Sequence, residues 1–461
     1  MSSHLWGMRL AALAIALIVS GCTSFSPDGG MSTVAAITGE SINQNVVKVS
    51  SEADEAWVQQ RVRRLNQGTL SADAAVQIAL LNNRDLQAAY NRLGIAEAIR
   101  VKQSRPIEPT FIFNSVSTAL ELDIEREIAA SVLSVLTQPM RTKIATAEFE
   151  RAQLRAAEET LQLATETRRV YWRAVGSRET VAALTDTETS AQHAASLAAE
   201  LEKTGALNKL EVARRQVFAV EVEAQLATAR QAADTTAERL TQLVGLETAS
   251  IGDKLPRALP PMPRAARTLV AVEQKAMDRR VDLQIGRMEV EALARSYGLT
   301  RATHFINVLD AGGISKTQKD RGLPSSDGGG FAIDFQVPLF DFGKANMREA
   351  EQRYLEAVNR LAQKVIAARS EVREAYGRYK SARAIVAKYD QEVLPLRQTI
   401  SEETELQYNA MQVDAFTLLA EARARSAAKV ASIEAKRNFW LAYTAAQIAA
   451  RPDASEERQS K

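Results

Sequence analysis

Side chains that could perform chemistry are few in this sequence, and they are widely spaced. The 461 residues include one cysteine, Cys22, and three histidines. His4 lies in the N-terminal leader, while His193 and His304 do not have the spacing of a metal site or a catalytic triad. Nine scattered methionines favour packing over a copper relay, and Gly328–Gly330 lacks the following residues of a phosphate-binding loop. The sequence therefore indicates neither an enzyme nor a bound metal or cofactor.

The single cysteine lies at the end of an export signal. Arg9 precedes the apolar run Leu10–Val19, which is too short to span a membrane as a helix. Val19-Ser20-Gly21-Cys22 resembles the lipobox of bacterial lipoproteins, which implies a signal peptide over residues 1–21 and a lipid on Cys22. The alternative is an ordinary secretory signal that contains a cysteine by chance. Lipidation is favoured because no other cysteine is present and no disulfide can form within one chain.

The residues after the cysteine bear on location. Thr23 and Ser24 follow Cys22, whereas an aspartate at this place favours retention in the inner membrane. The resemblance to lipoproteins therefore implies the outer membrane, with the acyl chains in its lipid.

The charge and composition of the chain exclude some partners. Loss of Arg9 with the signal leaves 57 of the 58 basic residues against 56 acidic ones, so no nucleic acid is implied as a partner. Charged residues make up 25% and aromatic residues 5% of the chain, which is typical of long helices. No stretch after Val19 is long and apolar enough for a transmembrane helix, so strands would have to make any membrane span.

The clearest structural signal is a change of hydrophobic period between residues 331 and 361. Apolar residues alternate from Phe331 to Leu339, which predicts a strand with one apolar and one polar face. A seam of alanine, valine and tyrosine then runs to Tyr389, which predicts a helix over 342–394, about 80 Å long. Small seam residues let helices pack closely in a sheet or a ring. We assign the joint between strand and helix to Pro338, Phe340, Asp341 and Gly343.

The rest of the chain reads as two repeats of one pattern. Residues 22–69 are predicted as a lipidated tether, irregular over 23–50, with a short helix over 52–65. The first repeat, 70–255, is predicted to hold a helix over 71–104, a hairpin over 110–137 with a charged break at 121–127, and helices over 140–204 and 208–244. After a linker at 256–264, the second repeat, 265–450, is predicted to hold a helix over 265–300, a hairpin over 304–339 with an exposed loop at 319–330 outside the cell, and long helices. A polar tail covers 451–461.

Two kinds of equivalent residues support the repeat. Asp85-Leu86-Gln87 and Asp282-Leu283-Gln284 occupy the same place in the first helix of each half. The turns Thr204–Asn208 and Ala410–Asp414 also match, and each places a capping residue before the next helix.

The predicted strands set a condition on assembly. Two strands per repeat give four per chain, and four strands cannot close a barrel in lipid, where each unpaired backbone group costs several kcal/mol. Two copies would supply eight strands and three would supply twelve, so the strand count alone does not choose between them. The protein must form oligomers if these strands lie in a membrane.

Several segments together resemble the TolC-like outer-membrane efflux family, over about residues 70–450. They are Val337–Ala345 (VPLFDFGKA), Val393-Leu394-Pro395, Tyr408 with the turn at Met411, and Leu240–Gly245 (LTQLVG). With the lipobox, they are similar to the lipoprotein members that serve multidrug or metal pumps. The resemblance implies a mainly α fold, in which a homotrimer shares a twelve-stranded transmembrane β-barrel and a long α-helical barrel in the periplasm.

The resemblance also implies a function and partners. The chain would be the exit duct of a tripartite efflux system that passes drugs, toxic compounds or metal ions from an inner-membrane pump and a periplasmic adaptor to the outside. The adaptor would dock at the two tip turns, on Gly205, Leu207, Asn208, Met411, Val413 and Asp414.

The predicted entrance of the duct departs from the family pattern. The positions where the family has gating aspartates are Thr417 and Ala420 here. Tyr408, Asp414 and Glu421 remain as gate candidates. Asp414 could instead only cap a helix, and Glu421 could lie on a solvated helix face.

Two other functions stay open on the sequence. An exit duct for type I protein secretion would use the same fold for another cargo. A periplasmic coiled-coil lipoprotein with a structural role would share the signal and the heptads, but it would not explain two strand pairs at matching places.

Overall fold

The computed structural model describes residues 24–105, 108–119, 121–246, 251–263, 277, 280–320 and 322–450. The predicted signal peptide, Cys22 and the polar tail lie outside the described residues. The chain forms two compact units, and each takes segments from both sequence repeats. The first comprises the described parts of Met1–Thr33, Tyr90–Ala156 and Val281–Val365, and the second comprises those of Val34–Ala89, Ala157–Arg280 and Ile366–Lys461.

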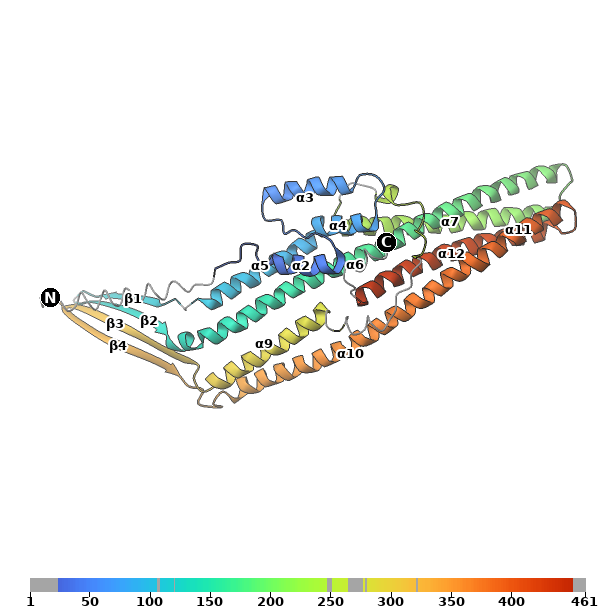
Figure 1. Cartoon of the computed structure of the whole chain (residues 1–461). Coiled ribbons are helices and arrows are strands. Elements are labelled where there is room, and N and C mark those ends of the chain that lie inside the picture. The colour runs from blue at the N-terminus through green and yellow to red at the C-terminus, as the bar shows by residue number, and fades with distance from the viewer. Residues whose placement is uncertain are drawn as a thin grey trace. The chain divides into compact units, whose positions relative to one another are not determined.

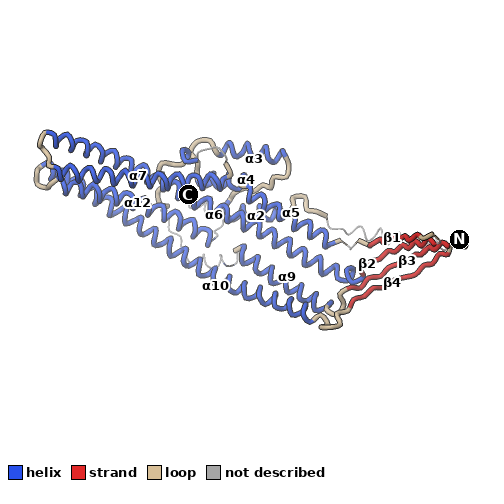
Figure 2. The backbone as a smooth tube through the Cα atoms, turned by 180° about the vertical axis from the view of Figure 1, so that it is seen from behind, coloured by secondary structure: helices blue, strands red, loops and turns tan. Residues whose placement is uncertain are grey.

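The secondary structure is mainly helical with four strands, as predicted (Figures 1 and 2). The helices are α2 (Met31–Ile42), α3 (Glu52–Leu65), α4 (Ala72–Asn82), α5 (Arg84–Ser104), α6 (Val132–Lys203), α7 (Lys209–Val244), α9 (Val281–Thr303), α10 (Lys344–Lys388), α11 (Leu394–Asn409) and α12 (Ala415–Ala450). The strands are β1 (Thr110–Ser117), β2 (Glu121–Ser131), β3 (Val308–Asp320) and β4 (Ser326–Gln336). In each half, two strands precede a long helix, a tip turn and a further helix, which is the two-fold repeat.

The four strands form one antiparallel sheet in the first unit, in the order β1-β2-β3-β4 (Figure 2). The register places Phe111 opposite Ile128, Ile128 opposite Gly313 and Gly313 opposite Phe331. Side chains paired in this way share a face. One face therefore carries mainly apolar residues, among them Phe111, Phe113, Ile124, Ile128, Phe331, Ile333 and Phe335, and the other carries mainly polar ones, among them Asn114, Glu121, Asp123, Glu125, Glu127, Lys316 and Asp334.

The predicted charged break at 121–127 is wrong, because these residues lie inside strand β2. Their acidic side chains occupy every second position, at 121, 123, 125 and 127, so all of them lie on the polar face. Between them, Leu122, Ile124 and Arg126 take the other face. The many charged residues suggested a break, although acidic and other side chains alternate here with the two-residue period of a strand.

The other ends of the hairpins also differ from expectation. Residues 132–137, predicted as strand, begin helix α6, and Pro139 lies inside that helix at the loss of one backbone hydrogen bond. The run is apolar without a period, which does not distinguish a strand from a helix. In the second hairpin, Gly328–Gly330 belong to β4 rather than to a loop, because their backbones pair with Ile314, Ser315 and Lys316.

The predicted irregular tether is bound to the folded part in the described residues. It contains helix α2, and residues after α2 are held by two glutamine side chains of α4 and α5. The amide of Gln77 accepts from Asn45 N at 3.0 Å and donates to Asn45 O at 2.8 Å. Gln87 in the same way accepts from Val49 N at 3.0 Å and donates to Val47 O at 2.9 Å. Each side-chain amide thus pairs with one N–H and one C=O group of the extended backbone, as the backbone of a neighbouring strand would.

The predicted helix over 71–104 is divided at Asn83. The Asn83 side chain accepts from Leu86 N at 3.0 Å, which caps α5, and donates to Leu243 O at 3.0 Å, which ties this break to the end of α7. The helix predicted over 265–300 is observed only from Val281, since most of 264–279 lies outside the described residues.

The core of the second unit lies where α4 packs against the middle of α6 and the end of α7. Trp172 of α6 stacks on Trp440 of α12 with ring centroids 4.7 Å apart, and the Trp440 indole donates to Pro260 O at 3.0 Å. Among the described helices, none has the length and apolar character needed to cross a membrane.

Candidate docking and gating site at the tip turns

The two tip turns of the second unit have the same backbone geometry. In the first, Gly205 N donates to Glu202 O at 2.9 Å and Ala206 N to Leu201 O at 2.9 Å. In the second, Met411 N donates to Tyr408 O at 2.9 Å and Gln412 N to Gln407 O at 2.8 Å. Both patterns are the Schellman ending of a helix, which requires a left-handed residue. Gly205 takes that position with φ of 75°, and Met411 takes it with φ of 57°.

Each turn is followed by the predicted helix cap. The Asn208 side chain accepts from Glu211 N at 3.0 Å, and the Asp414 carboxylate accepts from Thr417 N at 2.8 Å and from Thr417 Oγ1 at 2.7 Å. The hydrogen bond from the Thr417 hydroxyl, and to a smaller extent the one from its amide, lower the pKa of Asp414 below its usual value. Asp414 therefore begins α12 as an ionised cap at neutral pH.

Apolar side chains are exposed at both turns. Met411 is 94% exposed, Leu210 59% and Phe416 52%, while Leu207 and Val413 are half-buried. The Arg214 guanidinium lies over the Phe416 ring at 4.8 Å from its centroid, which joins α7 to α12 close to the turns. The predicted docking residues thus lie on two neighbouring turns. Each turn presents apolar side chains beside a helix cap, which is Asn208 in the first turn and Asp414 in the second.

The three gate candidates have different surroundings. Tyr408 is half-buried at the end of α11, and its hydroxyl makes no hydrogen bond within the described part of the chain. Asp414 is occupied by its capping bonds. Glu421 is only 9% exposed, which excludes the alternative that it lies on a solvated helix face.

The buried Glu421 is held by a cation from the facing helix. Its Oε2 lies 2.9 Å from Nη1 of Arg397 on α11. The pair joins the two helices of the second hairpin, because desolvation of a carboxylate is costly without such a partner. Glu421 thus serves the packing of α11 on α12 in this chain.

Contacts between the two hairpins were not predicted. Arg423 of α12 donates to Glu221 of α7, and Thr187 of α6 lies 3.3 Å from Ser426 of α12 between hydroxyl oxygens. A small apolar cluster, made of Ala191, Ala195, Phe218, Ala219, Val222 and Leu419, packs beside them. No sequence signal marks such pairs, because their members come from helices that lie about 200 residues apart.

The predicted joint between strand and helix is a tight turn in the first unit. The Asp341 carboxylate accepts from Gly343 N at 2.9 Å and from Ala345 N at 3.1 Å, which caps α10. Phe342 and Gly343 both have positive φ, 52° and 71°. Phe340, fully exposed, and Pro338 precede them.

The described part of the chain contains no group of three or more histidine, cysteine, aspartate or glutamate side chains placed to hold a metal ion. The predicted lipidation site, Cys22, is outside the described residues.

Comparisons with known proteins agree with the geometry. Residues 272–445 match the profile of a family described as outer membrane efflux protein. The chain is similar to the solved outer membrane protein VceC from Vibrio cholerae, with a TM-score of 0.68, 15% identity, and coverage of 85% of this chain and 97% of that one. The Campylobacter jejuni CmeC outer membrane channel gives a TM-score of 0.67 at 16% identity, over 89% of this chain and 92% of its own.

A third solved structure with a similar fold is that of an open channel. The open state of the Neisseria gonorrhoeae MtrE outer membrane channel gives a TM-score of 0.63 at 13% identity, over 85% of this chain and 89% of its own. No curated protein matches the sequence. At these identities the solved structures show the fold.

Proposed function

Since the chain carries the outer membrane efflux protein domain over residues 272–445 and the TolC-like fold, we propose that it is the outer-membrane exit duct of a tripartite efflux system. Three copies share one barrel of strands and one tunnel of helices. The duct passes small molecules, such as drugs, toxic compounds or metal ions, that an inner-membrane pump and a periplasmic adaptor deliver. Selection and energy come from those partners, and the duct catalyses no reaction.

The sheet is the observation that carries this proposal. One of its faces exposes large apolar side chains, with Phe331 83%, Phe111 72% and Phe335 70% exposed, while the other face is mainly polar. β1 and β4 are its outer strands, so each is paired along one side only among the described residues. In lipid those free edges must be paired. Pairing β1 of one copy with β4 of the next closes a ring, with lipid outside and water inside.

The mass of the purified protein in detergent tests the assembly. We expect light scattering, corrected for bound detergent, to give three times the chain mass. Two copies would contradict the twelve-stranded arrangement. A monomer that stays in solution without detergent after Cys22→Ala would overturn the duct itself.

Conductance tests the duct separately from its mass. We expect the trimer to form water-filled pores in a planar lipid bilayer, because the polar face of each sheet lines the interior. A trimer that never conducts, even after its tip is loosened, would contradict a transport function.

The tip turns are the proposed docking site for the adaptor. Their exposed methionine and neighbouring half-buried residues offer an apolar contact, and the hydrogen-bonded caps Asn208 and Asp414 hold it in place. We expect Val413→Lys to weaken binding of the purified adaptor about tenfold, because it places a charge in that contact. Gln231→Lys, on an exposed part of α7 far from the turn, is the matched control and should leave binding unchanged.

Of the gate candidates, Tyr408 fits a movable constriction best. Asp414 and Glu421 have fixed structural partners, whereas the Tyr408 side chain has none for its hydroxyl within the described chain. The gate would then be an aromatic constriction rather than an acidic ring.

A further inference from the structure

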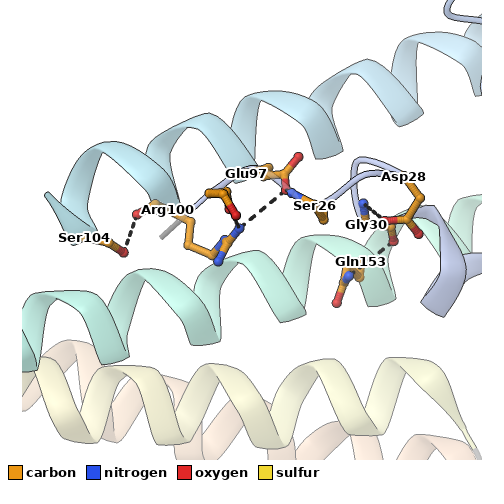
Figure 3. Close-up of polar contacts among 8 residues, drawn as sticks. Ser26, Asp28, Gly30, Glu97, Arg100, Ser104 and Gln153 are labelled. Carbon is orange, nitrogen blue, oxygen red and sulfur yellow. Dashed lines mark hydrogen bonds and ion pairs between the residues drawn. The ribbon is translucent and has the colours of Figure 1, made fainter. Parts of the chain in front are cut away.

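The residues that follow the predicted lipidation site are bound to helix α5 (Figure 3). Ser26 N donates to Glu97 Oε1 at 2.6 Å, and the Ser26 hydroxyl donates to the same oxygen. Arg100 Nη2 donates to Ser24 O at 3.2 Å. All of these residues belong to the first unit, which also holds the sheet.

The two charged side chains are built into the fold. The Glu97 side chain is 4% exposed and that of Arg100 is 16% exposed, with Arg100 Nη2 3.4 Å from Glu97 Oε1. The Arg100 guanidinium also lies over the ring of Phe149 on α6, 5.0 Å from its centroid. A buried carboxylate needs several donors, and Ser26 supplies two of those that Glu97 receives.

A second set of contacts holds the segment a few residues further on. Asp28 accepts from Gly30 N at 3.1 Å and from Ser32 N at 2.6 Å, which turns the chain into α2. Gln153 Nε2 of α6 donates to Gly30 O at 3.2 Å (Figure 3). Gly30 has φ of 80°, and a Cβ there would lie 2.6 Å from Phe149 Cζ, so only glycine fits this close approach.

We propose that Glu97, Arg100, Phe149 and Gln153 form an intramolecular binding site for the mature N-terminal segment, which we call the N-terminal clamp. Its partner is the backbone of Ser24–Gly30, since the clamp contacts the amide of Ser26 and the carbonyls of Ser24 and Gly30. Only Thr23 separates Ser24 from Cys22. The clamp therefore fixes the lipid anchor on the unit that holds the sheet, so that acyl chains and strands enter the same membrane as one body.

This inference rests on the proposed lipidation of Cys22, and the experiment separates the two. Ser24→Cys places a spin label on an exposed side chain and leaves the Ser24 carbonyl in place. Because Cys22 is the only native cysteine and its thiol is blocked by lipid, the new thiol is the only one that reacts. Mass spectrometry of the N-terminal peptide reports acylation independently of label motion.

We expect the label at residue 24 to be strongly immobilised in the full-length protein. Arg100→Ala, in the same background, should shorten its rotational correlation time by about tenfold, because the segment then moves as a flexible tether between the lipid and α2. Lys102→Ala, on an exposed site of the same helix, is the matched control and should change nothing. Glu97→Gln, which keeps the size of the side chain, should loosen the label partly.

Two results would overturn the inference. A label that is already mobile without any clamp substitution would show that the segment is a free tether. Equal mobility in the Arg100→Ala and Lys102→Ala proteins would show that the clamp does not hold it. An unmodified Cys22 thiol would overturn the anchor, and the label at residue 24 would then be measured in a protein that also carries Cys22→Ser, where its motion tests the clamp alone.

Discussion

Arg423 and Glu221 join the two helical hairpins of the second unit, with Nη2 of the arginine 2.9 Å from Oε2 of the glutamate. The same guanidinium lies 5.1 Å from the centroid of the Phe218 ring. One side chain of α12 therefore makes both a charged and an aromatic contact with α7. Any motion that separates the hairpins must break both contacts.

We expect Arg423→Ala to loosen the tip. The pair is about half exposed, so together with the ring contact its loss should weaken the packing of the hairpins by about 1 kcal/mol. Uptake of large antibiotics by cells that carry the variant should rise. Arg425→Ala is the matched control, because the polar contacts of Arg425 in the described part of the chain are with Gln398 and Ser401 of its own hairpin. Equal uptake in both variants would argue against a link between hairpin separation and leak.

Tyr408→Ala should also raise the passive leak of large antibiotics, by removing an aromatic ring from the proposed constriction. Tyr408→Phe should leave the leak low, because the hydroxyl has no hydrogen-bond partner among the described residues. Single-channel conductance of the purified trimer measures the same effect without cells. A leak that does not change in the alanine variant would remove Tyr408 from the gate.

Met411→Gly should stabilise the second tip turn by about 1 kcal/mol, because glycine adopts the left-handed conformation without the penalty that methionine has. Hydrogen exchange at the turn measures the gain. Adaptor binding should weaken at the same time, since the exposed Met411 side chain is lost. Gln412→Gly, one residue further and outside the left-handed region, should destabilise the turn instead.

The caps of the two tips should differ in their response to pH. The pKa of Asp414 is lowered in the folded chain, so its contribution to stability is complete above the unfolded value of about 4 and is lost as pH falls through the folded pKa. Asn208 does not titrate. Hydrogen exchange at the start of α12 should therefore quicken in acid relative to that at the start of α7. Asp414→Asn should remove the difference, and a difference that persists would contradict the assignment.

Gly343→Ala should prevent the strand–helix joint from forming. An added Cβ would lie 2.1 Å from the His304 carbonyl oxygen, and the residue has φ of 71°. We expect a loss of about 3 kcal/mol or more, seen as a low yield of folded protein. Gly377→Ala in α10 is the control, because its Cβ would meet nothing within 4 Å and alanine favours the helix. A normal yield for Gly343→Ala would show that the turn can rearrange.

Local signals were sufficient for much of the fold. The alternation from Phe331 and the heptad seam after Gly343 predicted β4 and α10, because both features depend on residues close in sequence. The tip turns were predicted from Asn208 and Asp414 for the same reason. The fold class followed from these elements and the repeat.

The parts that were missed depend on contacts between distant residues. Helix α2 and the extended segment after it have weak local signals, and they are held by Gln77 and Gln87 from another part of the chain. The burial of Glu421 against Arg397 was also missed, because the gate candidate was weighed only against a solvated helix face. The strand at Glu121–Glu127 is a different case, because its alternation was visible but its charge suggested a break.

The π-turn at Tyr389–Val393 places one extra residue in the long helix of the second repeat, between α10 and α11. It precedes Pro395, and Leu394 N donates to Tyr389 O across the wider turn. Each residue of a helix advances the direction of its side chains by about 100°. An extra residue in an unbroken α-helix would therefore turn every later side chain toward a different neighbour, whereas the wider turn absorbs that residue locally. Deleting one residue here would restore a continuous α-helix and leave the side chains from α11 to the second tip facing their present neighbours. In evolutionary terms, the wider turn is a place where this helix can gain or lose a single residue without changing the packing of its second tip.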